Sequence, residues 1–119
     1  QFRYVYGEEL LEIPAGKLNP GEDPAVTAAR ELEEETGWIP EKVEHLYTMY
    51  PTPGYTNEKI YIYRAEGVRE GMVHPDEDEF LTAAFYPVEE VAEMIRDGSI
   101  RDAKTIIAVQ RYLLEHQDR

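Results

Sequence analysis

The sequence predicts an α/β fold in which helices lie on the faces of a mixed sheet. Segments with strand-like composition, such as residues 3–6 and 43–49, occur before and after a segment with helical spacing and a cap residue at each end. The order of these elements along the chain favours a mixed sheet. No internal repeat or linker divides the sequence, so we expect one domain over residues 1–119.

The first two predicted strands cover residues 3–6 and 10–13, and Gly7-Glu8 joins them in a hairpin. Pro14 and Gly16 then flank Ala15, and this local sequence can hold the Ala15 carbonyl away from a strand ladder. Such a carbonyl could serve as an oxygen ligand. The chain begins at Gln1, without a methionine, directly in strand-like sequence, so we expect a segment to precede it.

A helix is predicted over residues 24–36. Asp23 is a suitable N-cap, Pro24 suits the first helical position, and Gly37 suits the left-handed residue just past the end. These signals together set both ends of the helix.

Three carboxylates share one face of this helix, because Glu31, Glu34 and Glu35 are spaced i, i+3 and i+4. Acidic residues at these spacings repel one another and, in the last turn, oppose the helix dipole. Arg30 can reach Glu34, but one cation cannot neutralise three anions. A hard divalent ion such as Mg²⁺, which prefers carboxylate oxygen, can. The alternative is a solvated acidic face that holds no ligand.

Two further strands are predicted after the helix, at residues 43–49 and 59–64, with the irregular loop YPTPGYTN between them. The segment 67–79 is expected to be a loop, and it contains a second acidic concentration, PDEDE. Residues 80–86 are predicted to form a strand.

The C-terminal part of the chain predicts two helices. Pro87 opens the first, residues 88–97, and Gly98 stops it. Asp102 caps the second, which is amphipathic. Its core contacts are expected among Ile106, Ile107, Val109, Tyr112, Leu113 and Leu114.

The composition limits the possible functions. Lys and Arg total 12 against 25 Asp and Glu, a net charge of -13, which argues against a nucleic-acid partner because a phosphate backbone would be repelled. A small phosphorylated substrate would be repelled too, unless cations reverse the sign locally. The absence of cysteine excludes disulfides and cysteine nucleophiles and fits a cytoplasmic location. No apolar run is long enough to span a membrane, so we expect no membrane partner.

The spacing around the acidic helix carries a more specific signal. After Gly16 come five residues and Glu22, then seven residues and Arg30-Glu31, and the segment closes with LEEETGW. This resembles the Nudix box, G-x5-E-x7-R-E-U-x-E-E-x-G-U, where U is a bulky apolar residue. Trp38 is the one departure, since an aliphatic residue is usual there.

Several shorter motifs resemble the ADP-ribose pyrophosphatase branch of the Nudix hydrolases: QFR, LLEIPAG, PTPGYTNE, DEDEF and RDAKT. Pro53 stands where a proline is typical of this branch. The resemblance implies a Nudix-type α/β/α sandwich around a mixed sheet. It also implies a homodimer, formed through an N-terminal region that the printed sequence lacks.

The resemblance further implies the site residues. Glu31 and Glu35 are the first-choice Mg²⁺ or Mn²⁺ ligands, Glu34 is a ligand or lies just behind one, and the Ala15 carbonyl completes the metal site. Arg30 orients the glutamates, and Glu22 has a supporting role. Glu77 is assigned as the base and Glu79 as a further ligand, and the reverse assignment stays open. Substrate contacts are expected from Arg3, Pro53, Gly54 and Tyr55.

The implied activity is Mg²⁺-dependent hydrolysis of ADP-ribose to AMP and ribose 5-phosphate. Divalent ions offset the charge of the diphosphate and lower the pKa of bound water, and a carboxylate takes the proton. The alternatives are hydrolysis of another nucleoside diphosphate linked to a group such as a sugar, or nucleotide binding without cleavage. A purely structural acidic domain would explain the charge but not the spacing.

Overall fold

The structure is a computed structural model, and it describes residues 1–71 and 83–116. The chain divides into two compact units. We call Pro14–Ala83 the central unit, and Gln1–Ile13 with Ala84–Arg119 the terminal unit. In the described part of the chain, no helix is long and apolar enough to cross a membrane.

The central unit contains the acidic helix α1, Pro24–Thr36. Its ends are the predicted ones: the Asp23 side chain accepts from the Ala25 N–H, and Gly37, at φ 79°, donates its N–H to the Glu33 carbonyl. The left-handed conformation at Gly37 favours glycine because it has no Cβ. Local sequence therefore determines where this helix begins and ends.

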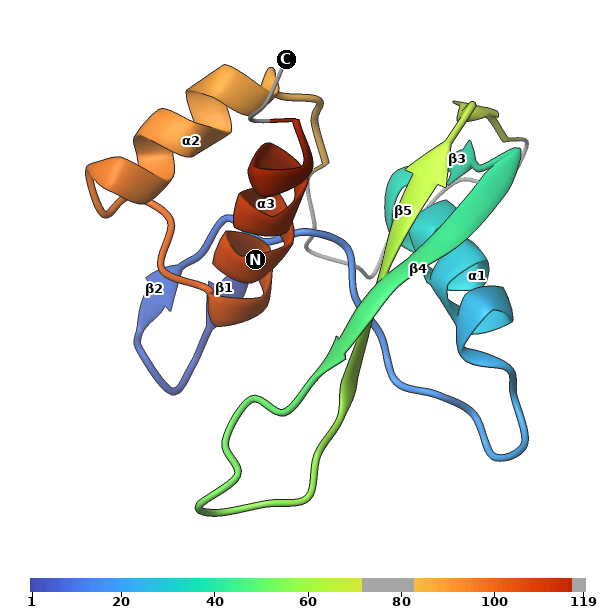
Figure 1. The fold of residues 1–119 in the computed structure, drawn as a ribbon, viewed down its shortest axis with the longest axis horizontal. Coiled ribbons are helices and arrows are strands. Elements are labelled where there is room, and N and C mark those ends of the chain that lie inside the picture. Colours follow the sequence, from blue (N-terminus) through green and yellow to red (C-terminus); the bar gives the residue numbers. More distant parts are fainter. Residues whose placement is uncertain (72–82, 117–119) are drawn as a thin grey trace. The chain divides into compact units, whose positions relative to one another are not determined.

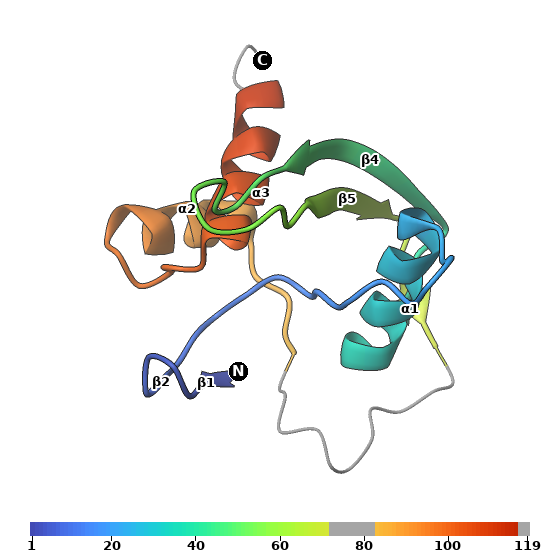
Figure 2. The same ribbon diagram turned by 90° about the horizontal axis from the view of Figure 1, so that it is seen from below.

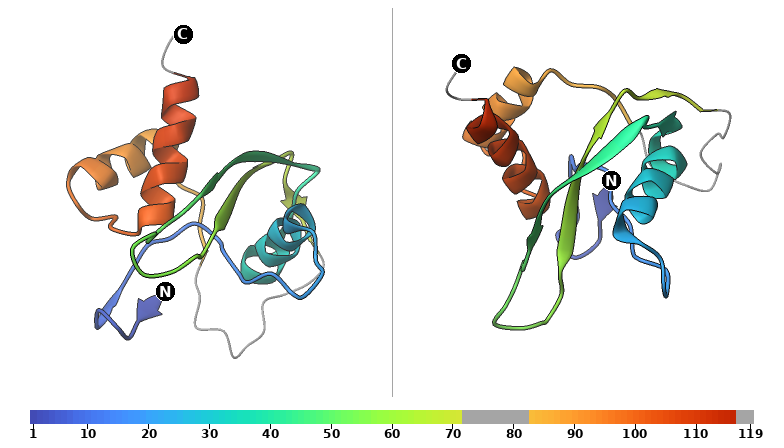
Figure 3. Two further views of the ribbon diagram at one scale, coloured as in Figure 1. Left: turned by 60° about the horizontal axis from the view of Figure 1, so that its bottom comes forward. Right: turned by 45° about the vertical axis from the view of Figure 1, so that its right-hand side comes forward.

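The helix α1 packs against a long antiparallel pair formed by β4, Lys42–Met49, and β5, Ile60–Glu66 (Figure 1). These strands confirm the predictions for residues 43–49 and 59–64. The register shifts between His45 and Tyr47, and Ile62 of β5 is buried. Figure 3 shows the pair as a twisted ribbon whose two strands the loop 50–59 joins.

A second, short pair of strands begins directly after α1 in the chain. The strand β3, Trp38–Ile39, pairs antiparallel with β6, Arg69–Glu70. Trp38, the departure from the box, is half-buried in this pair. The Gly71 N–H donates to the Gly37 carbonyl at 2.7 Å, which extends the same contact.

The terminal unit contains a short hairpin and two helices (Figure 2). The hairpin pairs β1, Phe2–Arg3, with β2, Glu8–Glu9. The helices are α2, Val88–Arg96, and α3, Ala103–Glu115, and they pack against each other. Ala92, Ile100 and Thr105 are the buried residues of this unit among those described. Asp102 caps α3 as predicted, with its carboxylate accepting from the Thr105 N–H.

The predicted hairpin exists, but its predicted strands, residues 3–6 and 10–13, are wrong. The N–H groups of Tyr6 and Gly7 both donate to the Arg3 carbonyl, and Gly7 has φ 68°. The turn therefore begins directly after Arg3 and includes the apolar residues 4–6. The strand-like composition of RYVY reflects exposed turn residues, since Tyr4 is 91% exposed.

One prediction near the C-terminus also needs correction. The strand expected at residues 80–86 is not found in its described part: residues 83–86 have no regular structure. A largely apolar sequence does not make a strand unless a partner strand pairs with it, and none of the described strands does. Of the six residues among which the core contacts of α3 are expected, Leu114 is 65% exposed.

Candidate functional site

Arg30 connects the acidic residues of the box. Its Nε and Nη2 groups donate to the two carboxylate oxygens of Glu22, each at 3.1 Å. Its Nη1 group donates to Glu31 at 2.9 Å and to Glu34 at 3.1 Å. The i+4 contact between Arg30 and Glu34 is the one the sequence predicts. One guanidinium thus ties the loop before α1 to two carboxylates on the helix.

These contacts shift the acidity of both partners. The hydrogen bond from Arg30 is the largest cause that lowers the pKa of Glu22 to about 2, and bonds from Thr27 and from the Asn19 backbone add to it. The hydrogen bonds that Arg30 donates to Glu22 and Glu34 raise the pKa of Arg30 above its usual range. Glu22 is therefore a supporting residue in this conformation, because its charge is held by Arg30.

Glu31 lies against the backbone of Gly16. A Cβ built on Gly16 would lie 2.0 Å from Glu31 Cδ and 2.4 Å from its Oε1, so only glycine leaves room for this carboxylate. The Glu31 side chain is 16% exposed. The presence of glycine at position 16 of the box thus has a steric explanation, since residue 16 and the Glu31 side chain occupy adjoining space.

Glu35 contacts the same loop at Ala15, the residue before Gly16. Its Oε2 accepts a hydrogen bond from the Ala15 N–H at 3.0 Å. The carboxylates of Glu31 and Glu35 therefore both border the turn at residues 15–16. This is the loop in which the resemblance to the Nudix hydrolases implies that the Ala15 carbonyl is a metal ligand.

The donor chemistry of these groups fits a hard divalent cation. Glu31, Glu34 and Glu35 offer carboxylate oxygens, which Mg²⁺ prefers, and Gly16 leaves space for the carboxylate of Glu31. In the conformation described, no three acidic or histidine side chains among the described residues lie close enough together to hold a metal ion. The reason is that Glu31 and Glu34 face Arg30 while Glu35 faces Ala15. Glu77 and Glu79, predicted as base and ligand, lie outside the described residues.

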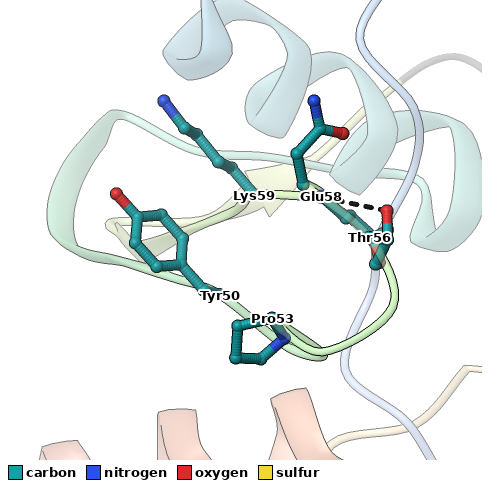
Figure 4. A pocket seen from close by; sticks show the side chains of 6 residues that line it. Tyr50, Pro53, Thr56, Glu58 and Lys59 are labelled. Atoms are coloured by element: carbon teal, nitrogen blue, oxygen red, sulfur yellow. Dashed lines mark hydrogen bonds between the residues drawn. The ribbon is translucent and has the colours of Figure 1, made fainter.

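The loop 50–59 forms a hollow of about 280 Å³ on the central unit. Its lining includes Pro53, one of the expected substrate contacts, but not Gly54 or Tyr55. Tyr50 and Lys59 rise from the two ends of the loop, and a hydrogen bond from the Glu58 N–H to Thr56 Oγ1 holds its last turn (Figure 4). The lining residues are Tyr50, Pro53, Thr56, Asn57, Glu58 and Lys59.

Arg3, predicted to contact substrate, forms a bidentate ion pair within the terminal unit. Its Nε and Nη2 groups donate to the Glu12 carboxylate, each at 2.6 Å. Lys104 Nζ reaches the same carboxylate at 2.7 Å. The bond from Arg3 is the largest cause that lowers the pKa of Glu12 to about 2, and it outweighs the opposing effect of burial.

Sequence reasoning assigned no role to several of these residues. Glu12 and Lys104 stand in LLEIPAG and RDAKT, motifs that carried the resemblance without a function of their own. A signal existed for Glu12, because a carboxylate in an otherwise apolar stretch requires a partner when it is buried. No such signal existed for Tyr50 and Lys59, since the hollow that both residues line depends on the path of the loop 50–59.

Comparison with known proteins places the chain in a family. The NUDIX domain profile matches residues 2–109. A methanol dehydrogenase activator from Bacillus methanolicus is 44% identical over 117 residues, which is 97% of this chain and 63% of that protein. An ADP-ribose pyrophosphatase from Bacillus subtilis (strain 168) is 39% identical over 112 residues, 92% of this chain and 60% of that protein.

A solved crystal structure of an ADP compounds hydrolase shares the fold, with a TM-score of 0.85 and 23% identity. The match covers 98% of this chain and 64% of that one, and it confirms the predicted fold class. The chain thus spans about 60% of the length of the curated relatives named above. Since the profile extends over most of the sequence and includes the whole box, the chain belongs to the NUDIX domain family.

Proposed function

We propose that this protein hydrolyses the diphosphate bond of ADP-ribose, giving AMP and ribose 5-phosphate, with Mg²⁺ or Mn²⁺ as cofactor. The observation that carries the proposal is the arrangement at residues 15–16, where Glu31 fills the space beside Gly16 and Glu35 accepts from the Ala15 N–H. The similarity to an ADP-ribose pyrophosphatase supports this choice of substrate.

The chain's own residues would hold the cation at this turn. Glu31, Glu35 and the Ala15 carbonyl are the first ligands, and Glu34 is a ligand or supports one. When bound, the cation offsets the charge of the diphosphate and lowers the pKa of a water molecule. Arg30 restrains Glu31 and Glu34, and Glu22 in turn restrains Arg30 through two hydrogen bonds.

In the reaction, a water oxygen forms a bond to one phosphorus, and the bond from that phosphorus to the bridging oxygen breaks. A carboxylate takes the proton of the water. We assign Glu77 to this step and Glu79 to a further ligand position, and the two roles can be exchanged. The leaving phosphate departs with the electrons of the broken bond.

Substrate contacts are proposed at two places. The hollow of the loop 50–59 offers a phenol from Tyr50, the ring of Pro53 and the ammonium of Lys59, which together suit a ribose or base with a nearby phosphate. Gly54 and Tyr55 remain proposed contacts of this loop. Arg3 is proposed to meet a phosphate of the substrate.

A panel of substrates tests this proposal. The purified protein is assayed with ADP-ribose, GDP-mannose, other nucleotide sugars and nucleoside triphosphates, with Mg²⁺ present, and the products are separated by chromatography. We expect ADP-ribose to have the highest kcat/KM. Preference for GDP-mannose or a triphosphate would instead support the alternative of another nucleoside diphosphate hydrolase.

We also propose that the protein is a cytoplasmic homodimer that acts on a small nucleotide rather than on nucleic acid or a membrane. The net charge of -13 supports the absence of a nucleic-acid partner. Sedimentation of the whole protein tests the dimer.

A further inference from the structure

Four charged side chains and one hydroxyl form a continuous network in the terminal unit. Glu12 accepts two hydrogen bonds from Arg3 and one from Lys104 Nζ. Lys104 Nζ also lies 3.0 Å from the Asp102 carboxylate. Asp102 accepts from Thr105 Oγ1, and the same hydroxyl accepts from the Ile13 N–H at 2.9 Å. The network joins the start of the chain to the N-terminus of α3.

The members of this network differ in exposure. The Glu12 side chain is 7% exposed and that of Lys104 is 15% exposed, whereas Arg3 is 40% exposed. A buried carboxylate needs partners, and Glu12 has two cations. Arg3 is therefore the outward member of a network whose other members are largely shielded from water.

The geometry of the Arg3 contact restricts its direction. A guanidinium is a planar group with five N–H donors, and a carboxylate that accepts from two of them fixes its plane. Here the two bonds use Nε and one N–H of Nη2. Lys104 Nζ donates to Oε1 of the same carboxylate, the oxygen that also accepts from Arg3 Nη2, so the acceptor that orients Arg3 is itself restrained.

The charge balance of the network also suits anion binding. Arg3 and Lys104 share Glu12, which leaves this trio with one positive charge. Asp102 offsets that charge, but its carboxylate also caps α3, where the helix dipole adds positive potential. In a chain of net charge -13, such a neutral to positive cluster is a place where a phosphate is not repelled.

We propose that Glu12 is a positioning residue for Arg3: with Lys104, it fixes the direction of the Arg3 guanidinium so that this cation meets a phosphate of the substrate in one orientation. The inference rests on the proposed function, in which Arg3 contacts the diphosphate. Arg3, Glu12 and Lys104 all belong to the terminal unit. The competing explanation is that the network only holds the start of the chain to α3.

A double-mutant cycle separates the two explanations. The variants are Glu12→Gln, Arg3→Lys and their combination, with Glu8→Gln as the matched control. Glu8 lies in the same unit and pairs with Arg101 at 3.2 Å, but both side chains are well exposed. KM and kcat for ADP-ribose are measured for each variant, and circular dichroism and thermal unfolding report the folded state.

If Glu12 acts through Arg3, we expect Glu12→Gln to raise KM about tenfold, the size expected when a charge-assisted hydrogen bond is lost. The kcat of folded protein should change much less. Arg3→Lys should raise KM by a similar factor, and adding Glu12→Gln to it should have no further effect. Glu8→Gln should leave KM unchanged.

The proposal would be overturned if Glu12→Gln raised KM by the same factor in the wild type and in Arg3→Lys. It would also be overturned if Glu12→Gln lowered the melting temperature and left KM unchanged. If Glu12→Gln does not fold, Lys104→Met replaces it in the same cycle. The dissociation constant for the substrate is also measured by calorimetry without metal. Binding without hydrolysis would refute the proposed function while the cycle on the dissociation constant still decides this inference. If no nucleoside diphosphate is bound or hydrolysed, both proposals are wrong.

Discussion

Glu31 occupies the space that a side chain at Gly16 would fill. A Cβ on Gly16 would lie 2.0 Å from Glu31 Cδ, and the backbone there is not in a left-handed conformation. The contact is therefore purely steric, and the group in the way is the end of a flexible side chain. Relief of the clash would move the carboxylate and leave the backbone in place.

Gly16→Ala should slow the proposed hydrolysis while the protein remains folded. We expect the free energy of unfolding to change by about 1 kcal/mol or less. The rate should fall by roughly a hundredfold, because a displaced catalytic group costs that much. Urea unfolding and turnover of ADP-ribose measure the two effects. Gly21→Ala is the control, because Gly21 has φ 76° and open space around it, so this change should reduce stability and spare activity.

Glu35→Gln should remove a metal ligand without breaking the turn. A glutamine oxygen can still accept from the Ala15 N–H, which Glu35 does at 3.0 Å, but the negative charge is lost. We expect the rate to fall on the order of a hundredfold and the Mg²⁺ requirement to rise. Manganese binding followed by electron paramagnetic resonance checks the ligand assignment. Glu33→Gln, on the same helix, should behave as wild type, and equal losses in both variants would contradict the assignment.

Arg30→Lys should lower kcat, because an ammonium cannot donate to Glu22 through two fixed N–H groups and also reach Glu31 and Glu34. A decrease of about tenfold or more is expected from the loss of several charge-assisted bonds. The matched control is Arg111→Lys, since Arg111 also pairs with a glutamate at i+4. Steady-state kinetics at saturating Mg²⁺ measure the effect. A wild-type kcat in Arg30→Lys would show that the Arg30 network is not needed for the reaction.

The stability of the protein should fall at acidic pH in a defined window. The pKa values of Glu12 and Glu22 are lowered from 4.5 to about 2 by their hydrogen bonds to arginine. A carboxylate whose pKa is lower in the folded state than in the unfolded state stabilises the fold at pH values above its unfolded-state pKa. This contribution is lost as the pH falls from 4.5 toward 2. Urea midpoints measured at pH 5, 4 and 3 should therefore decrease in that order. Glu12→Gln should reduce this slope, because it removes one of the two groups whose pKa is lowered in the folded state.

Lys59→Met should weaken substrate binding at the hollow of the loop 50–59. Lys59 lines the hollow together with Tyr50, and its charge would meet a phosphate of the nucleotide. We expect KM to rise about tenfold, the effect of losing one charged contact, with little change in kcat. Lys42→Met is the control, because Lys42 is an exposed residue at the start of β4. Equal KM values for the two variants would show that this loop is not part of the binding site.

The parts of the fold that depend on local sequence could be predicted. Asp23, Pro24 and Gly37 set the ends of α1 because a cap acts within a few residues of itself. The spacing of Arg30 and Glu34 likewise required no knowledge of the rest of the chain. The first hairpin was predicted with the wrong strands, since the register depends on the turn that Gly7 adopts.

Contacts between distant residues could not be predicted in the same way. Lys104 and Glu12 meet although 92 positions separate them, and no local pattern pairs them. The contact of Glu31 with Gly16 could be predicted in part. The box spacing indicates that the two residues belong to one motif, but only the structure shows that the Glu31 carboxylate fills the space that a side chain at position 16 would need. Residues 83–86 show the opposite failure, because their apolar composition predicts a strand although no described strand pairs with them.

The most direct test of the central claim is phosphorus NMR of ADP-ribose incubated with the purified protein, with and without Mg²⁺. We predict that the diphosphate signals are replaced by those of AMP and ribose 5-phosphate only when the cation is present, and that Glu35→Gln greatly slows the change. Persistence of the diphosphate signals with wild-type protein and Mg²⁺, or equal rates for wild type and Glu35→Gln, would contradict it.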